Sequence, residues 1–308
     1  MSYQHYFEDF LQTMNHIIYG KQEIIQEVLL TFLSGGHVLL KDKPGVGKTT
    51  LALAFAKGLG LDFKRIQFTP DVMPSDLTGF SIPDTQNKRF IYQPGVVFCN
   101  VLLADEINRT SPKTQSALLE VMEEGKVSVD GITRHVPQPF FVIATQNPDH
   151  AIGTQTLPEA QVDRFMIECS IGYPNRQAEL QLAQAVDSKK KIEKLTSLLQ
   201  IQTILEAMHE IEEVYVSDVI YQYIVDLVRQ TRNHPSLQVG ASPRATLALV
   251  KLSKAIAWLK KRDYVIPQDV QKQFPYVIGH RIQLSTKAMA QHLDKEELLE
   301  NIMRSIKG

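Results

Sequence analysis

The sequence has few cysteines, no long apolar segment and almost no net charge. Cys99 and Cys169 are its only cysteines and lack C-x-x-C spacing, so neither a disulfide framework nor a metal knuckle is expected. The balance of 33 basic and 34 acidic residues offers no electrostatic case for nucleic acid or an anionic membrane as the main partner. No apolar run approaches the roughly 20 residues of a membrane span, and the N-terminal segment carries Glu8 and Asp9 where an export signal is basic. These absences predict a cytoplasmic protein that does not insert into membranes.

A glycine-rich segment lies between an apolar run and a helical pattern. It reads Pro44-Gly45-Val46-Gly47-Lys48-Thr49-Thr50, follows the run His37 to Leu40, and leads into a helical pattern that begins at Leu51. Glycines allow the backbone to fold so tightly that successive amides point at phosphate oxygens, and the helix start adds the positive end of its dipole. Lys48 would reach the β- and γ-phosphates, and the Thr49 hydroxyl would complete the shell of a Mg²⁺ ion. The segment predicts a site for a nucleoside triphosphate.

One position departs from the usual phosphate-loop pattern. The pattern has glycine six residues before the lysine, and this chain has Asp42 there. Aspartate tolerates left-handed backbone geometry better than most residues, so we expect the loop to form. An acid beside phosphates is unfavourable, so the sequence predicts weaker nucleotide affinity at an intact site.

Two further strand ends carry polar side chains suited to phosphate chemistry. The run Val101 to Ala104 ends in Asp105 and Glu106, and the run Phe140 to Thr145 leads to Asn147. Ligands of open α/β sheets bind beyond the carboxyl ends of the strands, where the phosphate loop also falls. Asp105 could hold Mg²⁺ through water, Glu106 could orient or deprotonate the attacking water, and Asn147 could sense the γ-phosphate. A buried strand followed by a solvated turn is the alternative for each run taken alone.

Short apolar runs alternate with helical patterns up to about Ser170, and this alternation predicts an α/β fold with a mainly parallel sheet. The expected strands are His37 to Leu40, Phe63 to Phe68, Val101 to Ala104, Phe140 to Thr145 and Met166 to Ile171. After Gly172 and Pro174 helical periodicity takes over, with Ser217 and Ser242-Pro243 as expected helix starts. We therefore predict two domains, residues 1–173 and 174–308, the second a helical bundle.

Five segments together resemble the MoxR family of AAA+ ATPases. They are Pro44 to Thr49, Asp105-Glu106, Asn147, Leu157 to Phe165 and Gly240 to Arg244. The similarity continues through Val265 to Val270 and His280 to Ile282, and so extends over nearly the whole chain. The resemblance implies a P-loop AAA+ core with a parallel five-stranded sheet, followed by a small all-α lid domain.

The same resemblance implies ATP and Mg²⁺ as cofactors, and a ring, usually a hexamer, with ATP bound between subunits. Arg164 matches the arginine finger, and Gly20 lies in a segment that is similar to the adenine pocket. Arg244 matches the sensor 2 arginine of the lid, and we expect it to contact nucleotide and to couple the phosphate state to the lid angle. A cation in the first turn of a helix is unfavourable unless an anion is near, which supports that contact. For Arg164, a surface ion pair with Asp163 or Glu159 is the alternative.

Two insertions resemble those of the same clade. Between Pro70 and Phe98, the segments Leu77 to Gly79 and Tyr92 to Gly95 are similar to the edges of a hairpin inserted into helix 2. The stretch Gly125 to Arg134 alternates apolar and polar residues around Asp130-Gly131, which by itself predicts a hairpin. It resembles the pre-sensor 1 hairpin, so both hairpins are expected to face a client.

The resemblance implies chaperone-like remodelling or maturation of a client protein, often one with a von Willebrand A domain. A magnesium chelatase-type motor subunit and a DNA-translocating helicase-like motor are the alternatives. The second hairpin is too mixed in charge for a strong phosphate track, since its ionisable residues are Lys126, Arg134 and His135 against Glu123, Glu124 and Asp130. We expect a homo-oligomer with a protein client, and no nucleic-acid partner.

The motifs predict separate effects for the lysine and the glutamate. Lys48→Ala should lose most nucleotide affinity, because it removes a phosphate contact. Glu106→Gln should bind ATP and hydrolyse it poorly, because only that change removes a group needed mainly in the transition state. Calorimetry and an ATPase assay on both variants decide this, and parental turnover by Glu106→Gln would show that the assignment is wrong.

Overall fold

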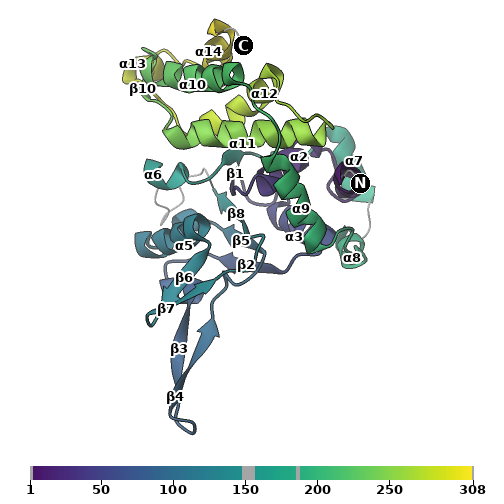
Figure 1. The fold of residues 1–308 in the computed structure, drawn as a ribbon, viewed down its shortest axis with the longest axis vertical. Coiled ribbons are helices and arrows are strands. Elements are labelled where there is room, and N and C mark those ends of the chain that lie inside the picture. The colour runs from purple at the N-terminus through teal and green to yellow at the C-terminus, as the bar shows by residue number, and fades with distance from the viewer. Residues whose placement is uncertain (1–2, 148–156, 185–187, 307–308) are drawn as a thin grey trace.

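The structure, a computed structural model, describes residues 3–147, 157–184 and 188–306. Its centre is a parallel five-stranded sheet with the order β2-β5-β8-β1-β9 (Figure 1). The strands are β1 (Val38–Lys41), β2 (Phe63–Gln67), β5 (Val101–Asp105), β8 (Phe141–Gln146) and β9 (Ile167–Cys169). Each predicted strand is present, with ends displaced by at most two residues. The α/β prediction is confirmed.

Helices cover both faces of this sheet. The helices α1 (Gln4–Ile17), α2 (Gln22–Leu33) and α3 (Lys48–Gly58) share one core with Val38 and Leu40, whereas α5 (Pro112–Glu124) shares the other with Leu39. Successive strand residues point to opposite faces, so neighbouring apolar residues of one strand enter different cores. This burial on both sides explains why β1, β5 and β8 read as nearly continuous apolar runs.

The chain after β9 is mainly helical. Its helices are α7 (Arg176–Gln184), α8 (Ser188–Glu193), α9 (Ile201–Glu212), α10 (Asp218–Asn233), α11 (Pro243–Leu259), α12 (Pro267–Ile278), α13 (Thr286–Ala290) and α14 (Lys295–Ser305). The hydroxyls of Ser217 and Ser242 cap α10 and α11 as predicted. The expected helical bundle also holds a short antiparallel pair, β10 (Leu237–Val239) and β11 (Gln283–Leu284). Residues of α2 and α11 belong to one continuous hydrophobic core, so lid and core pack directly on each other.

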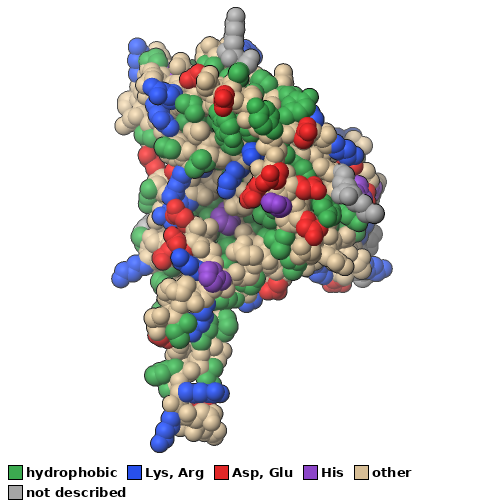
Figure 2. Space-filling model, in the orientation of Figure 1, with side chains coloured by type: hydrophobic (Ala, Val, Ile, Leu, Met, Phe, Trp, Pro, Cys, Tyr) green, Lys and Arg blue, Asp and Glu red, His purple; other side chains and the backbone are tan. Residues whose placement is uncertain are grey.

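Both predicted hairpins are present. The first, β3 (Gly79–Asp84) with β4 (Arg89–Pro94), follows α4 (Pro74–Thr78) and extends away from the body as an arm (Figures 1 and 2). The second joins β6 (Lys126–Val129) to β7 (Ile132–His135). At its turn Asp130 and Gly131 have φ of 54° and 74°, the paired positive values of a two-residue hairpin turn.

A buried histidine joins the amino end of the sheet to α5. The Val142 amide donates to Nδ1 of His37 at 3.1 Å, so Nε2 carries the proton and donates to the Met122 carbonyl at 3.0 Å. Burial lowers the pKa of His37 to about 4, which keeps this neutral form. His37 thereby fixes the end of α5, next to Glu123, relative to β1.

Within the described ranges, no helix is long and apolar enough to cross a bilayer.

Candidate active site

The phosphate loop connects β1 directly to α3. The helix begins at Lys48, three residues earlier than the sequence pattern predicted. Gly45 and Gly47 have φ of 87° and 95°, a conformation that glycine adopts without steric cost. A Cβ added at either position would meet no atom within 4 Å. The loop therefore encloses open space bordered by backbone amides, which suits an anion.

Lys48 lies across this loop. Its ammonium donates to the carbonyls of Asp42 and Lys43 at 2.8 and 3.2 Å. These are neutral acceptors, so a phosphate that enters the loop offers the ammonium a stronger, charge-assisted partner. Thr49 and Thr50 follow in the first turn of α3, half-buried beside the loop.

Asp42 does not face the phosphate position. Its carboxylate accepts from the Ser170 hydroxyl at 2.6 Å and from the amides of Ile171 and Gly172 at 2.7 and 2.9 Å. The residue is buried and lies outside the positive-φ region, so the expected left-handed geometry is wrong. The expected penalty for an acid beside phosphates has no geometric basis here. Asp42 instead ties the phosphate loop to the turn that leads into the lid.

The two acids converge on a buried threonine. The Thr145 hydroxyl donates to Oδ1 of Asp105 at 2.6 Å and accepts from the Glu106 amide at 2.9 Å. Glu106 has φ of 57°, a strained value for a residue with a side chain. Strands β5 and β8 thus hold Asp105 and Glu106 at their carboxyl ends, beside the phosphate loop that follows β1. The parallel sheet therefore brings the ends of these strands to one edge.

Both acids have basic or amide partners that sequence reasoning missed. Arg65 contacts Oδ2 of Asp105 at 2.7 Å, and Arg109 contacts Oε2 of Glu106 at 2.7 Å. The Gln67 amide also donates to Glu106 at 2.9 Å. Arg65 and Gln67 lie on β2, in register with β5. The available signal was the presence of polar residues in β2, and only strand pairing connects Arg65 and Gln67 with the acids.

The donors at this edge fit a magnesium-bound triphosphate. Thr49 and Asp105 offer the oxygen atoms that Mg²⁺ prefers, and Asp105 could act through water while Arg65 holds one of its oxygens. Among the described residues, no group of three or more His, Cys, Asp or Glu could hold a metal ion. Asn147 directly follows β8, and Pro148, the next residue, lies outside the described residues.

Gly20 lies where the N-terminal segment meets the start of the lid. Its φ is 67°, and a Cβ there would lie 2.8 Å from the Cβ of Ala178 in α7. The same helix is capped by Asn175, which accepts from the Ala178 amide at 2.8 Å. Glycine is therefore required by both backbone conformation and close packing, whatever Gly20 contributes to an adenine pocket.

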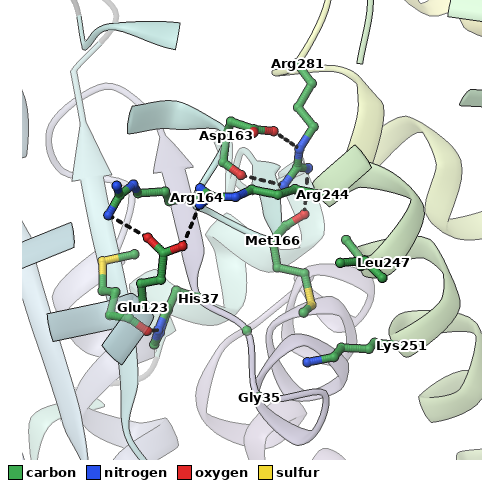
Figure 3. A pocket seen from close by; sticks show the side chains of 13 residues that line it. Gly35, His37, Glu123, Asp163, Arg164, Met166, Arg244, Leu247, Lys251 and Arg281 are labelled. Atoms are coloured by element: carbon green, nitrogen blue, oxygen red, sulfur yellow. Dashed lines mark hydrogen bonds and ion pairs between the residues drawn. The ribbon is translucent and has the colours of Figure 1, made fainter. Parts of the chain in front are cut away.

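The two arginines meet on one carboxylate. Arg164 follows α6 (Glu159–Val162), and Arg244 lies in the first turn of α11. Glu123, in the last turn of α5, contacts Nη1 of Arg164 at 2.9 Å and Nη2 of Arg244 at 2.5 Å (Figure 3). The alternative partners of Arg164 are engaged elsewhere, since Asp163 pairs with Arg281 and Glu159 accepts from Gln283. Sequence reasoning placed both arginines but missed their shared partner.

This arginine cluster lies at the end of the sheet away from the phosphate loop. It borders a cavity of about 250 Å³ that is also lined by Gly36 and His37, just before β1, and by Met166, just before β9. The phosphate loop follows the other end of β1, four residues on, or roughly 13 Å at the usual strand rise. The lid arginine is thus beside Arg164 and not at the phosphate loop of its own chain.

Comparisons with known proteins agree with this geometry. Residues 37–167 match the ATPase family associated with various cellular activities (AAA), and residues 229–302 match an AAA lid domain. The chain is 47% identical to the uncharacterized protein YeaC of Bacillus subtilis, over 96% of this chain and 93% of that protein. It is 38% identical to Chaperone MoxR1 of Mycobacterium tuberculosis, over 98% of this chain and 82% of that protein. The crystal structure of a candidate ATPase from Cytophaga hutchinsonii superimposes with a TM-score of 0.92 at 36% identity, covering 99% of this chain and 95% of that one.

The Asp42 contacts predict a structural role with little effect on phosphate binding. Asp42→Ala should lower the free energy of unfolding by about 2 kcal/mol, because two backbone amides lose their acceptor, and Ser170→Ala by less than about 1 kcal/mol. ATP affinity of Asp42→Asn should not rise. Urea midpoints and calorimetry measure both, with the exposed Asp71→Ala as control. Tighter ATP binding by Asp42→Asn would mean that the carboxylate does oppose the phosphates.

Proposed function

Because the chain belongs to the MoxR family of AAA+ ATPases, we propose that it hydrolyses ATP in a ring and uses the motion to remodel or mature a client protein. The client we propose is a protein with a von Willebrand A domain. The proposal of a ring rests on one observation, which is that the phosphate loop and the arginine cluster lie far apart in one chain. One chain holds both halves of a hydrolytic site at opposite ends of its sheet.

Hydrolysis needs positive charge that the phosphate-loop end cannot supply alone. Lys48 and the loop amides stabilise the bound phosphates, Glu106 orients the attacking water, and Asn147 contacts the γ-phosphate. The charge that develops on the transferred phosphoryl oxygens also has to be neutralised, and an arginine finger typically contributes about 10³ to 10⁵ in rate. We assign this role to Arg164 of a neighbouring subunit, with Arg244 beside it.

A head-to-tail contact brings the two halves together. In such a heterologous interface the arginine face of one subunit meets the phosphate-loop face of the next, and repetition of the same contact closes into a ring. Leu247, one turn after Arg244, is 64% exposed at the rim of the cavity, which supports a partner there. In this arrangement the nucleotide that Arg244 contacts is the one bound by the neighbouring subunit. ATP bound to one subunit then acts on the lid of the neighbouring subunit.

Mixing experiments test the shared site. Arg164→Ala and Glu106→Gln proteins should each bind ATP and be nearly inactive. Their mixture should regain activity, because some interfaces then join an intact Glu106 to an intact Arg164. Activity per subunit should also fall on dilution, since an isolated subunit lacks its neighbour's arginine.

A second mixture is the matched control. Arg164→Ala with Arg244→Ala should regain nothing if both arginines act on the neighbour's nucleotide, because no subunit then offers both. Restored activity in this mixture would show that Arg244 serves its own chain. Constant activity per subunit down to a monomeric concentration would remove Arg164 from catalysis altogether.

The hairpin arm supports a protein client. Phe90 is 75% exposed near its end, and four further apolar side chains on or beside the arm are exposed (Figure 2), namely Met73, Phe80, Ile82 and Ile91. Such an apolar surface is typical of a protein contact. The second hairpin offers little to nucleic acid, since Lys126 pairs with Glu124 and the Arg134 guanidinium stacks on Tyr92 at 3.8 Å.

The arm predicts where the client binds. A purified von Willebrand A protein from the same organism should be retained by Glu106→Gln with ATP, because blocked hydrolysis holds the complex. Retention should fall at least about tenfold in Glu106→Gln with Phe90→Ser, as for a buried aromatic anchor, and not with Val219→Ser, an exposed apolar residue of α10. Equal retention by both double variants would place the client elsewhere.

A further inference from the structure

Glu123 holds both arginines from a position between core and lid. It contributes one oxygen to Arg164, which belongs to the core, and the other to Arg244, which belongs to the lid (Figure 3). Arg164 also donates to the Leu119 carbonyl at 3.1 Å, so both of its contacts are with α5. In the part of the chain that the structure describes, this carboxylate is the only group that forms an ion pair with both guanidinium groups.

This arrangement has the form of a bound oxyanion. Guanidinium groups recognise carboxylate and phosphate oxygens through the same planar, charge-assisted hydrogen bonds. Arg244 lies in the first turn of α11, where a cation is unfavourable unless an anion lies nearby, and in the single chain Glu123 is that anion. The neighbouring turn is fixed independently, because Asp163 accepts from Arg281 at 2.8 Å and from the Ser242 hydroxyl. The positions of both arginine backbones therefore do not depend on Glu123.

We propose that Glu123 is an internal substitute for the γ-phosphate: it keeps Arg164 and Arg244 paired in the free subunit, and a neighbouring subunit's ATP displaces it. This inference rests on the shared site proposed above. It adds a positioning residue and a step of exchange, in which two guanidinium groups leave one carboxylate for a phosphate of higher charge.

The exposure of the cluster makes this exchange feasible. The side chains of Glu123, Arg164 and Arg244 are 44%, 33% and 41% exposed, and ion pairs of this exposure are weak, each worth about 2- to 5-fold in an equilibrium constant. A terminal phosphate carries more negative charge than a carboxylate and meets the arginines inside a drier interface, so it binds them more strongly. ADP lacks that phosphate, so the exchange distinguishes ATP from ADP.

The test measures ATP-dependent assembly with hydrolysis blocked. Sedimentation of a dilution series compares Glu106→Gln with the double variants that add Glu123→Gln or Glu124→Gln. Glu123→Gln removes the competing carboxylate, so the concentration for half-assembly with ATP should fall about 2- to 10-fold, with no change in ADP. Glu124→Gln is the matched control, because this substitution removes the same charge one residue away. Glu124 pairs with Lys126 at 3.1 Å and not with either arginine.

Each other outcome has a definite meaning. Assembly of the Glu123→Gln variant at an unchanged or higher concentration with ATP, alongside a parent that assembles, overturns the exchange and leaves the shared site standing. An equal shift in the Glu124→Gln variant overturns it as well, since net charge alone would then explain the result. A parent that stays monomeric with ATP overturns the shared site itself. Matching urea midpoints for the three proteins confirm that folding is not the cause.

Discussion

The five central strands all run in one direction, and this constraint separates the two halves of the candidate site. Their carboxyl ends bring the phosphate loop, Asp105, Glu106 and Thr145 together. Their amino ends border the cavity of Arg164, Arg244 and Glu123. In the shared site that we propose, a second copy of the chain brings the missing half, and the proposed ring is consistent with this strand direction.

Buried polar contacts keep each half in place. Thr145 fixes both acids, Asp42 fixes the turn that leads into the lid, and His37 fixes the end of α5 beside Glu123. Each contact satisfies backbone or carboxylate groups that would otherwise be buried without partners, which is costly. The outer charges are held more loosely. The side chains of Arg65, Arg109 and Glu123 are each partly exposed at their ion pairs, and such partners can be exchanged for a phosphate or a metal ion without unfolding the protein.

Two kinds of contact join the lid to the core, one apolar and one ionic. The continuous hydrophobic core between α2 and α11 resists separation of the domains, whereas the Glu123 and Arg244 pair is weak and polar. In the proposed cycle we therefore expect the large apolar contact to act as the pivot and the ion pairs to be the part that nucleotide changes. The hairpin arm lies on the core side, away from the lid (Figure 1), so we expect it to follow the motion of the core.

The sequence by itself determined the elements and the residue types of the chemistry. Apolar runs bounded by Gly45, Asp105 and Asn147 predict strands and their polar ends, because burial on both faces of a sheet and the needs of phosphate binding leave local patterns. The direction of the Asp42 carboxylate, the Arg65 and Gln67 contacts and the meeting of Arg164 with Arg244 were decided only by the tertiary structure. These depend on strand register and on how the lid packs against α5, which join residues 39 to 128 positions apart. Local sequence periodicity does not predict which residues pair over such distances.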